Sequence, residues 1–204
     1  MAPQPEARAI ADRFMYDTGN LKLLATQLPE GGLARTVPAL EWTVRQVLAH
    51  LAAGQLGYAE TLERMATGAT AFTAEEFEQP RIAVDQLVGA APLPLPKILD
   101  DFDSSLRRMV AQLNVLSEEA LHLSVGDRTL LAILHAWSDH AAGHAIQLLG
   151  ALPELRGDPM LLNWLLYQDF SGEPAQFALQ QTLFAEVRER DANEYDEMPN
   201  EETP

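Results

Sequence analysis

Apolar residues recur at alternating steps of four and three in the second half of the chain. This spacing places them along one side of an α-helix and is typical of helices that pack together in bundles. The seam of the predicted helix consists of Leu95, Leu99, Phe102, Leu106, Met109, Leu113 and Leu116. Because such a seam must be buried against other helices, the sequence predicts an all-α fold.

Three more apolar stripes of helical period complete a predicted four-helix bundle over residues 1–153. The first stripe runs from about Pro5 to Leu28, the second from Thr43 to Gly68, and the last, capped by Gly126 and Asp127, to Leu152. Asp17 falls on the first stripe. We expect it at the flank of the buried face, because inside that face it would need a polar partner.

The connection between the second and third predicted helices is long. Thr43 and Gln46 form a capping box, which sets the start of the second helix. After Gly68 no sustained helical period returns before Pro96. Such a connection exceeds the short loops of an up-down-up-down bundle, so we expect a crossover topology.

Two more helices are predicted beyond the bundle, over residues 154–192. The first, capped by Asp158, is apolar on nearly every side as far as Phe170, so it must either wedge against the bundle or contact a second copy of the chain. The second runs from about Glu173 to Arg190. We expect the acidic residues 193–204 to form a disordered tail.

Composition excludes several classes of protein. A net charge of −16, with 14 basic residues that form no stripe, disfavours binding to nucleic acid. No apolar run is long enough to cross a membrane, and the first residues lack the pattern of a signal peptide. The chain has no cysteine and therefore no disulfide framework. We expect a cytoplasmic protein whose chemistry relies on histidine and carboxylate groups.

The five histidines are few enough for their positions to be informative. His140 and His144 are one helical turn apart at the edge of an apolar face. His50 lies at the edge of the matching face of the second predicted helix, beside Gly54 and Gly57, whose lack of bulk lets another backbone approach. Two histidines four residues apart, with a third from another helix, can hold a divalent metal and leave one coordination position open.

Other interpretations of these histidines stay open at this point. An isolated pair four residues apart is more often buried and hydrogen-bonded than metal-bound. A zincin-type protease needs a glutamate directly after the first histidine, whereas position 141 is alanine. His135 and Asp139 project from the solvated side of the same predicted helix, where we expect them to form an ion pair, so His135 is not expected to be a ligand.

Two stretches resemble the signatures of the DinB-like superfamily, and the resemblance covers most of the first 152 residues. Residues 42–51, WTVRQVLAHL, resemble its second-helix signature, in which a histidine and a leucine follow eight residues after a tryptophan. Residues 140–148, HAAGHAIQL, resemble its fourth-helix signature of two histidines four apart followed by a glutamine and a hydrophobic residue. The resemblance implies a bundle with a long crossover connection. It also implies that His50, His140 and His144 hold a divalent metal, with zinc or nickel as the first candidates.

Members of this superfamily with known activity include the metal-binding domain of mycothiol-dependent maleylpyruvate isomerase and bacterial thiol S-transferases. The resemblance therefore implies a low-molecular-weight thiol cosubstrate and a transferase or isomerase that acts on a small electrophile. Gln147, Arg45 and Trp137 are candidates for lining the pocket, although helical tryptophans are more often core residues. The competing hypothesis is a non-catalytic, stress-associated metal-binding scaffold that forms a homodimer through residues 160–170.

Overall fold

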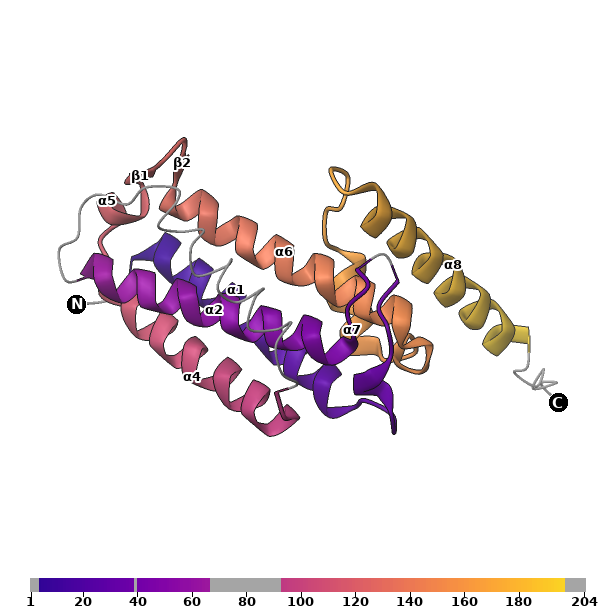
Figure 1. The fold of residues 1–204 in the computed structure, drawn as a ribbon. Coiled ribbons are helices and arrows are strands. Elements are labelled where there is room, and N and C mark those ends of the chain that lie inside the picture. Colours follow the sequence, from indigo (N-terminus) through magenta and orange to yellow (C-terminus); the bar gives the residue numbers. More distant parts are fainter. Residues whose placement is uncertain (1–3, 39, 67–92, 197–204) are drawn as a thin grey trace, which may run out of the picture.

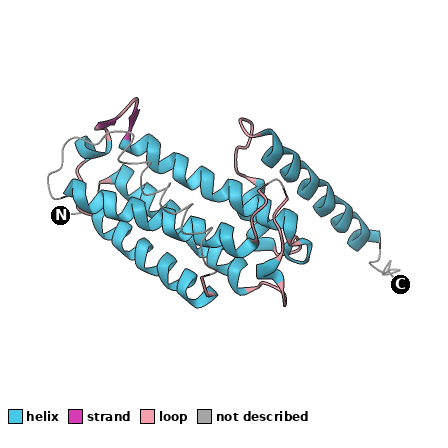
Figure 2. Cartoon of the chain, in the orientation of Figure 1, coloured by secondary structure: helices cyan, strands magenta, loops and turns pink. Residues whose placement is uncertain are grey.

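The computed structural model of the protein is built almost entirely of helices (Figure 2). It describes residues 4–38, 40–66 and 93–196. The strands within these residues are β1 (Ser124–Val125) and β2 (Arg128–Thr129), which pair in a short antiparallel hairpin. None of the described helices is both long enough and apolar enough to cross a membrane. The prediction of an all-α fold is confirmed.

Four long helices lie side by side and enclose the core. They are α1 (Pro5–Thr26), α2 (Val44–Ala66), α4 (Leu95–Leu113) and α6 (Leu130–Ala151). In Figure 1, α2 lies in front of α1, with α6 above them and α4 below. Helices α1 and α2 each pack against both α4 and α6, so α1 and α2 face one another diagonally across the core.

Helices α2 and α4 are neighbours that run in the same direction. In the first turn of α2, Arg45 donates a hydrogen bond of 2.7 Å to the carbonyl of Leu93, just before α4 begins. Near the other ends of the two helices, Arg108 forms hydrogen bonds of 2.6 and 2.7 Å with Glu63. Parallel neighbours require a long connection, in agreement with the predicted crossover. The predicted connection itself lies mostly outside the described residues.

Some boundaries differ from the predictions. Helix α1 ends at Thr26, two residues before the predicted end. The N-cap of α6 is Thr129, whose hydroxyl accepts a hydrogen bond of 3.2 Å from the amide of Ala132, so the predicted cap at Gly126 and Asp127 was wrong. Those two residues form the turn between β1 and β2, where Gly126 adopts a left-handed φ of 65°.

The buried face of α4 is rotated slightly from the predicted seam. Phe102, Met109 and Leu113 are fully buried as predicted, but Leu95, Leu99 and Leu106 are only partly buried. Ile98 and Ser105 take their places in the interior. The Ser105 hydroxyl is satisfied there by a hydrogen bond of 2.7 Å to the carbonyl of Asp101.

The chain continues through the short η2 (Pro153–Leu155) into α7 (Pro159–Leu166) and α8 (Pro174–Asp196). Asp158 caps α7 as predicted, accepting from two backbone amides. Four residues of α7 are buried against the same chain, so this helix is wedged against the bundle: Leu161, Leu162, Trp164 and Leu165. Helix α8 extends to Asp196, so residues 193–196 of the expected tail are helical, and residues 197–204 lie outside the described chain.

Asp17 lies inside the protein, so its predicted position at the flank was wrong. The residue is only 4% exposed, and its Oδ1 accepts a hydrogen bond of 2.9 Å from the indole Nε1 of Trp164. Burial raises the pKa of Asp17, and the nearby charge of Arg13 offsets this only in part. The carboxylate therefore fastens α7 to α1.

Candidate metal centre

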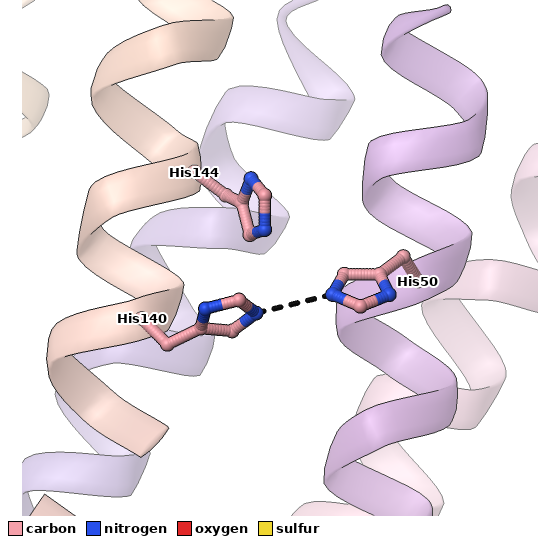
Figure 3. A group of neighbouring side chains, drawn as sticks. All are labelled: His50, His140 and His144. Carbon is pink, nitrogen blue, oxygen red and sulfur yellow. Dashed lines mark hydrogen bonds between the residues drawn. The ribbon is translucent and has the colours of Figure 1, made fainter. Parts of the chain in front are cut away.

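Three histidines from two helices converge on one point. His50 on α2 is buried, at 3% exposure, while His140 and His144 on α6 are half-buried. One ring nitrogen from each residue can be chosen so that all three lie within 4.8 Å of one another. Figure 3 shows the three rings directed into the same space between the helices. The structure thus brings together the three residues that the sequence suggested as ligands.

The spacing of two of the ring nitrogens suits either a hydrogen bond or a shared ion. The Nε2 atoms of His50 and His140 are 3.1 Å apart. Two imidazole nitrogens bound to one tetrahedral zinc at about 2.0–2.1 Å lie about 3.3 Å apart. The other ring nitrogens of the cluster are farther apart, and side-chain movements of about 1–2 Å bring them to the spacing that zinc requires. The donor set therefore fits a divalent metal.

Trp137 packs beside His140. The centroids of the two rings are 5.2 Å apart, and the indole also lies 4.9 Å from the ring of Tyr58. The indole reaches this position because Gly54 on α2 has no side chain: a Cβ atom there would lie 2.3 Å from the indole. Our expectation that Gly54 admits a backbone was therefore wrong, since it admits an aromatic ring.

Trp42 forms a second aromatic contact, which the sequence did not predict. Its ring centroid is 5.2 Å from that of His50. The backbone carbonyl of Trp42 accepts a hydrogen bond of 2.7 Å from Val37, which fixes the turn that carries it. Arg35 fastens the same segment to η2, just after α6, through two hydrogen bonds to Glu154, which lower the pKa of Glu154 to about 2.

The other candidates for the pocket lie in different places. The side-chain oxygen of Gln147 is 2.9 Å from Nδ1 of His144, so this residue touches the histidine cluster. Arg45 instead directs its guanidinium to the carbonyl of Leu93. A role for Arg45 at the metal centre stays a prediction.

His135 lies away from the cluster, on the exposed side of α6. We had expected Asp139 to form an ion pair with His135, but it does not. Arg13 of α1 reaches between them and lies 2.6 Å from Asp139 and 3.3 Å from Nδ1 of His135. His135 is therefore a suitable control for experiments on the other histidines of this helix.

The charge of the donor set decides what an ion bound there would attract. Three neutral imidazoles contribute no charge, so a divalent ion on them keeps its full charge of +2. His140 and His144 are partly exposed, so water can reach these two rings. An anionic fourth ligand, such as a thiolate, is therefore favoured over a cationic one.

The family model for the mycothiol maleylpyruvate isomerase N-terminal domain matches residues 18–153. No curated protein and no solved structure matches the chain. The matched region contains all three histidines of the cluster and ends where η2 begins, so α7 and α8 lie outside it.

Proposed function

The chain belongs to the family of the mycothiol maleylpyruvate isomerase N-terminal domain, a DinB-like domain, and on that premise we propose that it is a cytoplasmic metalloenzyme that uses a low-molecular-weight thiol. Its reaction is the transfer of that thiol to a small electrophile, or a thiol-dependent isomerisation. The observation that carries the proposal is the convergence of three imidazoles, with one ring nitrogen of each within 4.8 Å of the others, at a partly exposed position.

Each residue of the cluster has a defined task in this proposal. His50, His140 and His144 hold the divalent ion, zinc or nickel. A metal ion in that position lowers the pKa of a thiol that binds to it. Trp137 and Trp42 pack beside His140 and His50, where they restrict ring motion and exclude water from those sides. Because the chain has no cysteine, the reacting sulfur must come from the cosubstrate.

The metal content of the purified protein tests the first half of the proposal. We expect about one equivalent of divalent metal in the wild type, since one three-histidine set holds one ion. His144→Ala removes a ligand and should lose most of this metal. His135→Ala changes a histidine of the same helix that lies outside the cluster and should retain it. Equal metal content in the two variants contradicts the assignment.

A turnover assay tests the second half. The protein is mixed with mycothiol and an activated alkene such as a maleyl compound, with and without added zinc or nickel. We expect metal-dependent consumption of the alkene by the wild type and by His135→Ala, and none by His144→Ala. Background rates in every sample, despite full metal loading, would end the thiol-dependent part of the proposal.

One observation favours the second candidate, a homodimeric metal-binding scaffold. Three large apolar side chains of the C-terminal extension are exposed: Met160 at 60%, Tyr167 at 82% and Phe177 at 45%. Half of the residues of α7, the helix that suggested the dimer at first, are already buried by their own chain. Light scattering over a range of concentrations decides the matter, and a monomer at the highest concentration removes the dimer.

A further inference from the structure

Gln147 contacts the one nitrogen of His144 that faces away from the other two histidines. The two residues are one turn apart on α6, and the side-chain oxygen of Gln147 is 2.9 Å from Nδ1 of His144. Figure 3 shows the other nitrogen of that ring directed into the space shared with His50 and His140. The glutamine thus lies behind the ring, on the side opposite the proposed ion.

The direction of this hydrogen bond determines which ring nitrogen can bind a metal. A neutral imidazole carries one proton, on either Nδ1 or Nε2, and only the nitrogen without it can be a ligand. An amide oxygen can only accept a hydrogen bond, so the contact requires the proton of His144 to be on Nδ1. Nε2 then presents its lone pair to the space between α2 and α6.

We propose that Gln147 is a positioning residue that selects the tautomer and the ring orientation of His144 for metal binding through Nε2. The inference rests on the proposed metal site and assigns the group that prepares it. Histidine ligands commonly donate their second N–H to a carbonyl or carboxylate, which fixes the ring and strengthens the ligand. Here a glutamine of the same helix supplies that acceptor.

The placement of Gln147 on the same helix gives His144 a restraint of its own. His50 and His140 already restrain each other, because their Nε2 atoms are 3.1 Å apart and one can donate to the other. That bond joins α2 to α6 and is exchanged for metal–nitrogen bonds when an ion binds. The bond between Gln147 and His144 lies within α6, so it is kept with and without metal.

Nitrogen-15 NMR of the metal-free wild type tests the tautomer directly, because protonated and unprotonated ring nitrogens differ strongly in chemical shift. We expect the proton of His144 on Nδ1. The opposite orientation of the amide would donate from nitrogen to Nδ1 and place the ring proton on Nε2, where it blocks coordination. A wild-type His144 with its proton on Nε2 therefore overturns the inference.

Zinc titration of three variants against a competing chelator tests the consequence. Gln147→Met keeps the length of the side chain but removes the acceptor, and we expect zinc affinity to fall by about 10- to 100-fold. Gln147→Glu keeps an acceptor in place and should bind zinc at least as tightly as the wild type. Gln112→Met makes the same change at a half-buried position of α4, diagonally across the bundle, and should have no effect.

The outcomes separate this inference from the proposed function. If Gln147→Met binds zinc as tightly as the wild type, or if Gln147→Glu loses zinc equally, Gln147 does not position His144. If the affinities follow the expected order but no thiol turnover is found, the thiol chemistry fails and the positioning role stands. If the wild type binds no zinc, both fail. Circular dichroism of each variant verifies that the helices are intact.

Discussion

At the scale of single residues, Gly54 matters because it has no side chain. A Cβ atom at this position would lie 2.3 Å from the indole of Trp137, which packs 5.2 Å from the ring of His140. Gly54→Ala should therefore push the indole towards His140, destabilise the fold by about 1–3 kcal/mol and weaken zinc binding. Urea denaturation and zinc titration measure the two effects.

Gly19→Ala is the matched control for this substitution. Gly19 lies in the middle of α1 on its exposed side, and a Cβ atom there would meet no other atom within 4 Å. The change should stabilise the protein by about 0.5–1 kcal/mol, because alanine favours the helix more than glycine does. A Gly54→Ala variant as stable as Gly19→Ala would show that Trp137 is not held in this position.

The sequence predicted best the relations between residues that lie on the same helix. His140 and His144 share an edge of α6 because of their spacing alone, and Gln147 follows within the same turn. His50 was a candidate from its place at the edge of its own helix, and the family resemblance strengthened its pairing with His140, because no local pattern relates two residues that are 90 positions apart. Gly54 was singled out correctly, but its neighbour was not predictable, since nothing in the sequence pairs it with Trp137.

At the scale of elements, Asp17 fastens α7 to α1 at the cost of a buried charge. Burial raises its pKa above the ordinary value of 3.8, so the native state binds this proton more tightly than the unfolded chain does. The stability that this tighter proton binding contributes is present below about pH 3.8 and is lost as the pH rises through the raised pKa of the folded state. Arg13 offsets part of the loss, and Asp139 adds to it.

Two substitutions of Asp17 separate its charge from its hydrogen bond. Asp17→Asn keeps an oxygen for the indole Nε1 of Trp164 without the charge, so it should be more stable than the wild type at pH 7 and lose this advantage below about pH 3.8. Asp17→Leu leaves the indole N–H without that acceptor and should cost about 1–3 kcal/mol. Urea denaturation across this pH range compares them with the wild type, and an Asp17→Asn variant no more stable than the wild type at pH 7 would contradict the burial argument.

Helix starts were predictable where the signal is local and unambiguous. The capping box of Thr43 and Gln46 and the cap at Asp158 were both correct, because each involves residues within one turn. Gly126 and Asp127 were misassigned because the same residue types begin helices and form hairpin turns. The hydrogen-bond partner of Asp17 could not be predicted, because Trp164 lies 147 positions away in the sequence.

At the scale of the whole molecule, the proposed ion would join two helices that are far apart in the chain. Helix α2 supplies His50 and helix α6 supplies His140 and His144, and these helices also pack against α1 and α4. An ion that binds only the folded arrangement stabilises the entire fold. The gain is about 2.7 kcal/mol when free zinc is 100-fold above its dissociation constant.

Thermal unfolding with and without zinc measures this coupling. Zinc should raise the Tm of the wild type and of His135→Ala by similar amounts, and a chelator should reverse the rise. His50→Ala removes the only histidine that α2 contributes, so the remaining pair lies on one helix and no longer joins two. Its Tm should respond little to zinc, whatever its starting value, because binding to α6 alone does not depend on where α2 lies. An equal rise in His50→Ala would mean that zinc acts elsewhere, and the centre between α2 and α6 would have to be abandoned.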